Sequence, residues 1–510
     1  MGIATVNTAT ILGVDAHIIE VEADVSIGLG SFNIVGLPDG AIKESRDRVI
    51  AALNNATDGF PIRKVIVNLA PADIRKMGTG FDLPIAIAVL EAHGKIPSKC
   101  LEGYLLIAEL ALSGKLRAVE GILAVALAAK KAGIMKLIVA PENAGTLSLL
   151  ENLEIHTAAT LQEVVAHCHG QQLISPHQYN SPGLSSLKTM AFDFSDVKGQ
   201  ETAKRSLEIA AAGMHNVLFT GPPGSGKSML SKRLPTILPP LLLDEILEVT
   251  KIHSIAGTLE GVDTIVATRP FRSPHHSVSG AGIIGGGTIP KPGEISLAHL
   301  GVLFLDELPE FPRRILDLLR QPVEDKRITI SRANISLVFP SDFILLAAMN
   351  PCPCGYLGDK ERGCSCTASA IMKYRSRISG PMIDRIDLQI EMPALSYEEL
   401  NFSPKGEKSE RIRARVLGAR AIQLERFKEN ETKYNSNMQH KDLECFCELD
   451  QEGHILLAQA LKKFHLSSRA HDSILKVART IADLEGAKKI QIWHLAEALN
   501  YRCLDKEINF

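Results

Sequence analysis

The chain has 510 residues, too many for one ordinary hydrophobic core, and typical domain lengths give roughly three domains. Hydrophobic residues make up 45% and charged residues 22%, which excludes a disordered or collagen-like chain. Lys and Arg number 56 against 58 Asp and Glu, a net charge of −2, so any nucleic acid must be held by local basic patches.

The longest apolar stretches, such as Phe81–Leu90 and Gly121–Ala129, are shorter than the roughly 18 to 20 residues that span a bilayer. The first residues also lack the basic region and apolar run of a signal peptide. We therefore expect a cytoplasmic protein without membrane contact. Nine cysteines in a reducing compartment indicate metal binding or simple burial, in place of disulfides.

The sequence pattern divides the chain into four parts. Residues 1–169 alternate β-like runs with alanine-rich helical stretches, and residues 170–191 have the polar, aperiodic composition of a linker. Residues 192–395 alternate strands and helices again, and residues 396–510 have a helical period near 3.6. We predict an N-terminal α/β domain, an α/β nucleotide-binding core and a C-terminal helical lid. In chain order, the predicted strands are Ile18–Val25, Lys64–Asn68, Leu105–Leu112, Lys136–Ala140, Val217–Thr220, Val302–Leu305 and Phe343–Ala348, and the predicted helices are Ile42–Leu53, Pro84–His93, Ile122–Ala132, Arg411–Phe427, Gly453–Phe464, Arg469–Leu484 and Ile492–Tyr501.

A complete phosphate loop follows the strand Val217–Thr220 and precedes a helix that starts near Met229. Glycines let backbone amides surround phosphates, Lys227 neutralises the β and γ charges, and the Ser228 hydroxyl completes a magnesium shell. The alternative is a chance glycine turn, but strand, loop and helix all agree with a nucleotide site. We expect ATP and Mg²⁺ to bind here. The loop is Gly221, Pro222, Pro223, Gly224, Ser225, Gly226, Lys227 and Ser228.

Two further strand ends supply the other polar groups of such a site. Asp306 and Glu307 follow the apolar strand Val302–Leu305, where Asp306 can hold the magnesium and Glu307 can polarise the attacking water. Asn350 ends a third strand, so its amide can orient the same water. Adjacent carboxylates at a strand end can also be merely solvated, but the phosphate loop upstream favours the catalytic interpretation.

Four cysteines directly after Asn350 form two Cys-x-Cys units, Cys352 with Cys354 and Cys364 with Cys366. Four thiolates can make a tetrahedral zinc site that braces the loop positioning Asn350. Because the spacing departs from the commoner Cys-x2-Cys, ordinary reduced thiols stay an alternative.

The order of phosphate loop, Asp-Glu strand, Asn-terminated strand and helical lid resembles the AAA+ ATPases. Residues 196–200, with Val197, resemble the segment that covers adenine there. Three stretches, residues 269–276, 292–301 and 379–388, resemble the magnesium-chelatase-like branch, specifically the bacterial YifB/ComM family.

That resemblance assigns arginines to a site shared between subunits. It implies that Arg385 is the finger reaching a neighbour's γ-phosphate, with Arg377 as a rival, and that Arg469 contacts ATP in cis from the lid. A planar cation stabilises the charge of the transferring phosphoryl group. A finger supplied in trans implies a ring, which we expect to be a homohexamer.

Two basic segments are candidate DNA contacts. Residues 327–338 alternate polar and apolar side chains around Arg332, which predicts a hairpin with a basic tip and resembles the pore hairpin of MCM-type helicases. The glycine-rich insert 269–287, with Arg272, His275 and His276, is expected to be a second pore element. The histidine pair alone is a weak metal signal.

The first domain resembles the proteolytic domain of Lon, a ribosomal S5 domain 2-like fold, most clearly in residues 108–121. The serine nucleophile and helical lysine that Lon chemistry requires are both absent, and Thr79 and Lys76 are the nearest substitutes. We therefore expect an inactive scaffold.

The family resemblance implies an ATP-dependent DNA translocase or helicase that promotes branch migration while transforming DNA is integrated by homologous recombination. Its expected partners are single-stranded and branched DNA, further copies of the chain and recombination proteins. Two alternatives stay open: the motor of a metal-chelatase complex, which the relatedness allows, and an ATP-dependent unfoldase or protease, which the missing serine and lysine disfavour.

Overall fold

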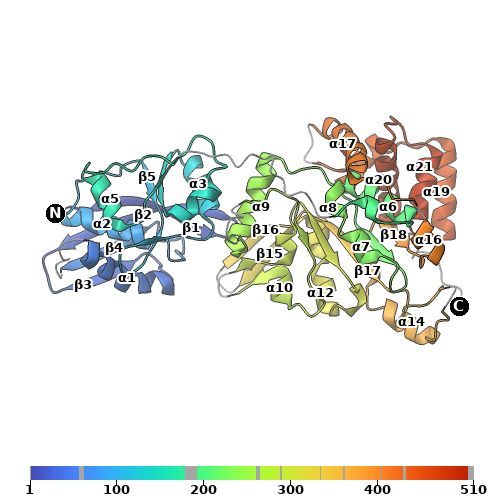
Figure 1. The fold of residues 1–510 in the computed structure, drawn as a ribbon, viewed down its shortest axis with the longest axis horizontal. Helices are drawn as coiled ribbons and strands as arrows, with labels where there is room; N and C mark the ends of the chain where they lie inside the picture. The colour runs from blue at the N-terminus through green and yellow to red at the C-terminus, as the bar shows by residue number, and fades with distance from the viewer. Residues whose placement is uncertain are drawn as a thin grey trace. The chain divides into compact units, whose positions relative to one another are not determined.

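A computed structural model describes residues 2–56, 63–177, 192–259, 265–287, 290–332, 335–359, 362–402, 404–428 and 432–502. The chain forms two compact units (Figure 1). Unit 1 comprises Met1–Leu187 and Leu243–Ala267, and unit 2 comprises Lys188–Leu242 and Thr268–Phe510. Both units combine helices with sheets, which confirms the predicted α/β fold class.

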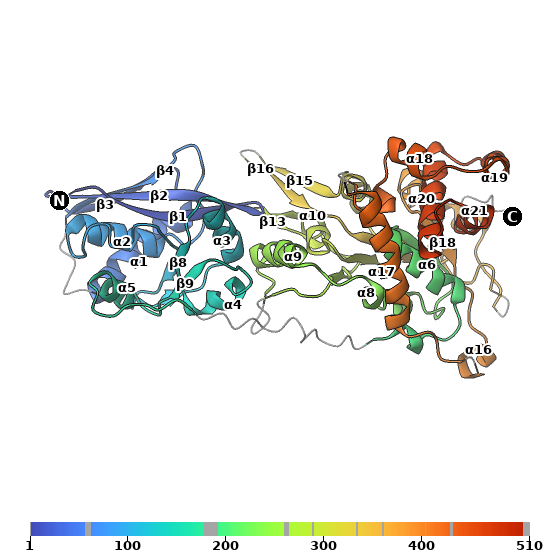
Figure 2. The same ribbon diagram turned by 90° about the horizontal axis from the view of Figure 1, so that it is seen from above.

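Unit 1 is built on a seven-stranded sheet in the order β3-β4-β2-β1-β5-β8-β9. The pairs β1 with β2 and β2 with β4 are antiparallel, and the other neighbours are parallel. Figure 2 shows α1, α2 and α5 lying beneath β2, β3 and β4. The bounds are β1 Ala4–Leu12, β2 Asp15–Ser26, β3 Ser31–Val35, β4 Lys64–Ala70, β5 Tyr104–Leu106, β6 Glu109–Leu110, β7 Leu116–Arg117, β8 Lys136–Val139, β9 Glu154–Thr157, α1 Gly40–Ala56, α2 Asp82–His93, α3 Ile122–Lys131, α4 Ala144–Leu147 and α5 Leu161–Cys168.

The core of unit 1 lies on both faces of this sheet. Along β2, Ile19 and Val21 join the cluster that holds α2, whereas Ile18 packs on the cluster that holds α3. Strand β8 is almost continuously buried, as parallel strands covered on both faces are. The predicted strand 105–112 is wrong in its extent, because Ala108 leaves the sheet to exchange backbone hydrogen bonds with Gly80 and Leu83.

One helix of unit 1 comes from the middle of the chain. Helix α9, Leu243–Ala256, packs against α3, and its Ser254 hydroxyl accepts a 3.0 Å hydrogen bond from the Gly121 amide. Its Lys251 pairs with Asp15 at 3.2 Å. The predicted nucleotide-binding core, 192–395, includes this segment, but its apolar side chains pack within unit 1, where Leu247 joins the α3 cluster.

Unit 2 has a five-stranded parallel sheet in the order β11-β14-β17-β10-β18. The strands β10, β14 and β17 are buried along their whole length. In an open parallel sheet of this kind, loops at the carboxyl ends of the strands form the ligand site. The bounds are β10 Val217–Thr220, β11 Phe271–Arg272, β14 Val302–Leu305, β17 Ile344–Met349 and β18 Leu388–Glu391.

Helices surround this sheet and extend into the lid. Helices α17, α20 and α21 gather beside α6 (Figure 1), and their apolar side chains share one core cluster with the sheet. None of the described helices is both long and apolar enough to span a membrane. The remaining bounds are α6 Glu201–Gly213, α7 Lys227–Ser231, α8 Leu234–Ile237, α10 Gly280–Ile284, β12 Gly285–Gly286, β13 Lys291–Pro292, α11 Glu294–Leu297, α12 Arg313–Leu318, α13 Arg320–Asp325, β15 Arg327–Arg332, β16 Ile335–Pro340, α14 Ala368–Arg375, α15 Gly380–Ile383, α16 Tyr397–Phe402, α17 Ser409–Arg426, α18 His440–Phe446, α19 Gln451–Lys463, α20 Ser468–Leu484 and α21 Ile492–Asn500; short 3-10 turns lie at Pro141–Asn143, Phe194–Asp196, Leu308–Glu310 and Asn435–Asn437.

Candidate nucleotide site

The phosphate loop connects the end of β10 to the first turn of α7. Gly224 and Gly226 have φ values of 81° and 91°, which residues with a Cβ rarely adopt. A Cβ on Gly221 would lie 2.2 Å from the carbonyl oxygen of Met392. These backbone requirements explain why glycine occupies the three positions.

Lys227 points its ammonium group into this loop. Its Nζ donates to the carbonyl oxygens of Gly221 at 2.6 Å and Pro222 at 2.8 Å, and lies 3.3 Å from Asn350 Oδ1. Burial lowers the pKa of Lys227, and the charge of Asp306 opposes that shift only in part. These three oxygens are uncharged, so they do not neutralise the Lys227 ammonium group. The loop therefore holds a positive charge that a phosphate anion can neutralise.

Strands β14 and β17 bring the predicted acidic and amide groups to the same edge. The Ser228 hydroxyl donates to Asp306 Oδ2 at 2.6 Å, so a hydroxyl and a carboxylate oxygen adjoin, as Mg²⁺ requires of its ligands. Leu305 is the register partner of Ala347, so Asp306 and Asn350 follow neighbouring strands. The structure thus gathers Lys227, Ser228, Asp306 and Asn350.

Glu307 lies beside this group with its carboxylate open to solvent. Its side chain is 56% exposed, and its Oε2 lies 3.5 Å from Nδ1 of His276. The structure places His276, a predicted DNA contact, against Glu307 and beside His275, with ring centroids 4.0 Å apart and the ring planes tilted by 35°. Arg272, from the same predicted DNA segment, forms a two-point ion pair with Glu294 at 2.7 Å, which neutralises its charge.

The segment predicted to cover adenine lies near the phosphate loop. Val197 is buried in the core cluster of unit 2. Gln200, which the sequence analysis did not single out, donates from Nε2 to the carbonyl oxygens of Ser225 at 3.2 Å and Pro393 at 2.8 Å. Its backbone is left-handed, with φ 55°, a feature that the sequence does not signal.

The two family-assigned arginines meet at the other edge of the sheet. Arg385 precedes β18, whose first residue, Leu388, is the register partner of Val217 at the start of β10. Because the strands are parallel, this edge is opposite to the phosphate loop. Arg385 Nε donates to Glu324 Oε2 at 3.0 Å, and Arg469 Nη2 donates to Glu324 Oε1 at 2.9 Å.

A cavity of about 580 Å³ opens at this pair of arginines. Arg385, Arg469 and Glu324 line it together with Lys326 and Lys476, and no residue of the phosphate loop does. The expected cis contact of Arg469 with ATP does not fit this placement. Arg377, the alternative candidate for the finger, forms an ion pair with Glu310 at 2.8 Å. Glu310 lies three residues beyond Glu307.

The hairpin predicted around Arg332 exists as β15 and β16, paired antiparallel from Arg327 with Pro340 to Arg332 with Ile335. Its tip, Ala333 and Asn334, lies outside the described residues, and so does the direction of the Arg332 side chain.

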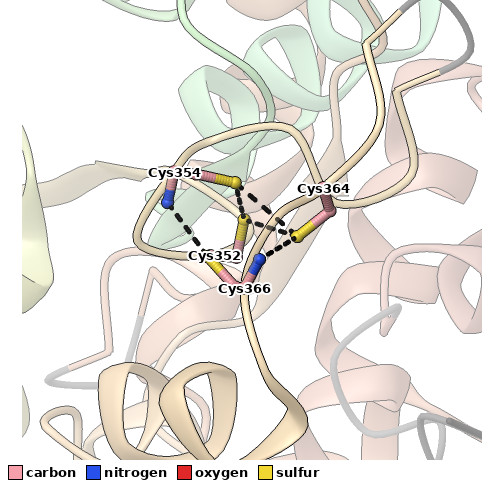
Figure 3. Close-up of side chains that lie close together, drawn as sticks. All are labelled: Cys352, Cys354, Cys364 and Cys366. Carbon is pink, nitrogen blue, oxygen red and sulfur yellow. Dashed lines mark hydrogen bonds between the residues drawn. The ribbon is translucent and has the colours of Figure 1, made fainter.

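The two Cys-x-Cys units come together after Asn350 (Figure 3). The four sulfurs of Cys352, Cys354, Cys364 and Cys366 all lie within 4.8 Å of one another. Backbone N–H groups of Tyr356 and Ser365 lower the pKa of Cys354 to about 6, whereas burial and hydrogen bonds with neighbouring thiols raise the pKa of Cys364 to about 12 and that of Cys366 above its ordinary value.

In unit 1, the substitutes for the Lon dyad do not form a catalytic pair. Lys76 is fully buried, and its ammonium group donates to the carbonyl oxygen of Pro71. Burial lowers the pKa of Lys76. Thr79 is partly exposed, and its carbonyl accepts a hydrogen bond from the Asp82 amide.

The five-stranded parallel sheet carries a phosphate loop after β10, an acidic pair after β14 and an asparagine after β17. This arrangement defines a P-loop protein of the AAA+ class. Three family models match the chain. Residues 193–400 match "Magnesium chelatase, subunit ChlI", residues 21–143 match "Subunit ChlI of Mg-chelatase", and residues 406–502 match "Magnesium chelatase, subunit ChlI C-terminal".

Known proteins resemble the chain, some over nearly its whole length and others over part of it. It is 45% identical over 513 residues to "Competence protein ComM" of Haemophilus influenzae, covering 99% of this chain and 98% of that protein. It is 43% identical over 508 residues to "Uncharacterized protein YifB" of Escherichia coli, covering 99% and 98%. The "Magnesium-chelatase 38 kDa subunit" of Cereibacter sphaeroides is 25% identical over 247 residues, 45% of this chain and 72% of that protein. The chain therefore belongs to the YifB/ComM family of magnesium-chelatase-like AAA+ proteins. Membership implies ATP and Mg²⁺ as ligands and ATPase activity.

Proposed function

We propose that this protein is a ring-forming ATPase that translocates on DNA and promotes branch migration during the integration of transforming DNA. The name of the Haemophilus relative supports a role in competence. The observation that carries the DNA assignment is the hairpin β15–β16, because only Ser341–Phe343 separate it from the start of β17, the strand that ends before Asn350. A movement of Asn350 can therefore reach the hairpin through β17 itself.

The residues of the phosphate-loop edge have distinct tasks. Lys227 binds phosphate oxygens, Ser228 and Asp306 supply oxygen ligands to magnesium, Asn350 orients a water, and Glu307 accepts a proton from it. ATP bound there supplies the phosphoanhydride bond whose hydrolysis drives the motor.

Arg385 and Arg469 act on the nucleotide of a neighbouring subunit. Both lie at the sheet edge opposite to their own phosphate loop and share Glu324 as partner. A head-to-tail contact that brings this edge onto the next subunit's loop closes into a ring, for which we propose six copies. Glu324 holds the two guanidinium groups until a γ-phosphate replaces it.

The test is ATP turnover with no DNA and with single-stranded, duplex and branched DNA, followed by strand displacement on the branched substrate. We expect turnover to rise several-fold with at least one DNA and branch migration to require ATP. Turnover indifferent to every DNA, together with degradation of casein, would instead favour a protease.

Unit 1 serves as a scaffold in this proposal. Its Lon-like fold is proposed from the sequence, and the burial of Lys76 supports the absence of proteolysis. The motor works in the cytoplasm, where ATP and DNA meet, with recombination proteins as further partners. Zinc is the second metal proposed for the chain, supported by the four sulfurs of the cysteine cluster.

A further inference from the structure

The cysteine cluster has the dimensions of a single tetrahedral metal site. Cys352 Sγ lies 3.3 Å from Cys354 Sγ and 3.6 Å from Cys364 Sγ, and the last two sulfurs are 3.6 Å apart. Four thiolates at about 2.3 Å from one zinc ion have sulfurs about 3.8 Å apart. The observed separations are far from the roughly 2.05 Å of a disulfide.

Backbone groups complete the surroundings of these sulfurs. The Cys354 amide donates to Cys366 Sγ and the Cys366 amide donates to Cys364 Sγ, each at 3.4 Å (Figure 3). Such N–H groups stabilise thiolate charge around a bound metal. Sulfurs this close leave room for one ion and not for an iron–sulfur cluster, and an all-thiolate tetrahedron suits zinc.

The cluster also lies between two parts of the nucleotide site. Cys352 is two residues after Asn350, whose Oδ1 is 3.3 Å from Lys227 Nζ. Gly355, inside the loop between the two cysteine pairs, approaches the phosphate loop so closely that a Cβ there would lie 2.7 Å from Cδ of Pro223.

Helix α14 starts at Ala368, two residues after Cys366, and its last residues contact the chain beside Asn350. Arg375 Nε donates to the carbonyl oxygen of Pro351 at 3.2 Å, and the backbone of Asn350 hydrogen-bonds the Tyr374 hydroxyl. The chain on both sides of the cysteines is therefore anchored to the residue next to Asn350.

We infer that a zinc ion on these four cysteines holds residues 351–359 against Pro223 and thereby fixes Asn350 for hydrolysis. This inference rests on the proposed ATPase site. Gly355 and the cysteines are positioning residues, since they act through Asn350. Losing the ion frees the loop and lowers turnover more than ATP affinity, because Lys227 and the phosphate-loop amides still bind the phosphates.

The experiment compares the full-length protein with three variants. Cys364→Ser removes a ligand, and Cys445→Ser is the matched control at an exposed cysteine outside the cluster. Gly355→Ala disturbs the Pro223 contact and strains the backbone at φ 88°, but it removes no ligand. The readouts are zinc per chain by mass spectrometry, hydrogen exchange of a peptide covering 349–358, nucleotide Kd and turnover.

We expect about one zinc per chain in the wild type, Cys445→Ser and Gly355→Ala, and none in Cys364→Ser. Cys364→Ser and Gly355→Ala should exchange faster over 349–358 and lose at least about tenfold in kcat, with Kd changed less than about threefold. Wild-type protein with no zinc, or with iron in its place, overturns the metal assignment. Zinc present with unchanged exchange and turnover in Gly355→Ala overturns the bracing role and leaves the ATPase proposal standing. Should Cys364→Ser fail to fold, Gly355→Ala decides the second point and wild-type metal content the first.

Discussion

Mixing two inactive variants shows whether each arginine acts on the ATP of its own subunit or on that of a neighbouring subunit. Lys227→Ala removes the phosphate-loop cation, and Arg385→Ala removes the finger at the opposite sheet edge. In the proposed ring, each variant alone leaves every interface without one essential group. In a mixed ring, an interface works when an intact phosphate loop faces an intact arginine edge.

The expected recovery follows from this geometry. If a fraction p of subunits carries Arg385→Ala, a working interface has probability p(1 − p), so an equal mixture should regain about a quarter of wild-type turnover whatever the ring size. Arg469→Ala mixed with Lys227→Ala should recover the same quarter, because Arg469 shares Glu324 with Arg385. Arg385→Ala mixed with Arg469→Ala should recover nothing, since each neighbour then lacks one arginine.

The assay is steady-state ATP turnover against mixing ratio, after subunit exchange. As a matched control, Arg413→Ala, an exposed lid arginine, should leave turnover unchanged. Recovery of a quarter by Arg385→Ala with Arg469→Ala would place Arg469 beside its own phosphate loop and refute the shared-edge reasoning.

Three further predictions concern the site, the hairpin and the lid. Lys227→Ala should abolish nucleotide binding, whereas Glu307→Gln should keep the nucleotide Kd and lose about 100-fold or more in turnover, measured by fluorescent-nucleotide titration and phosphate release. Arg332→Ala should spare basal turnover, remove DNA stimulation and make the slope of log affinity against log salt shallower by about 1 for each lost phosphate contact, whereas unchanged stimulation would exclude this residue as the DNA contact. Burial would raise the pKa of Asp387, but hydrogen bonds with His215 and Ser473 hold it at about 2, below its ordinary 3.8. Asp387→Asn should therefore lower the free energy of unfolding by about 2 kcal/mol at neutral pH, and the difference should persist to about pH 4 and disappear towards pH 2, which urea titrations at several pH values test.

The sequence predicts those parts of the site in which local chemistry is decisive. The loop 221–228 needs glycines because its backbone adopts positive φ values and approaches neighbouring backbone closely. The strand before Asp306 is entirely apolar, a pattern that predicts its burial. The sequence shows the two Cys-x-Cys units but not that they meet, because their spacing departs from the commoner Cys-x2-Cys; the structure brings the four sulfurs together. The close approach of His276 to Glu307 leaves no such signal, because it depends on where the chain after β11 crosses the end of β14.

Tertiary packing decides the structural features that could not be predicted from the sequence. The apolar residues of helix α9 predict that one face of the helix is buried, but the sequence does not predict that α3 is the helix that covers this face. The short strands β5 and β6 stand where one strand was predicted, because Ala108 bonds to the loop before α2. In both cases the apolar pattern predicts burial correctly, but the sequence does not predict which segment packs or bonds against it.

The placement of Arg469 has the largest consequence for function. A basic residue at the start of a lid helix is compatible with either edge of the sheet, and only the packing of α20 beside Arg385 selects one. With both arginines on Glu324, Arg385 and Arg469 lie at the sheet edge opposite to the phosphate loop of their own subunit. In the ring proposed above, these two arginines reach an ATP only through contact with a second copy, so hydrolysis should depend on protein concentration in the way that ring assembly does.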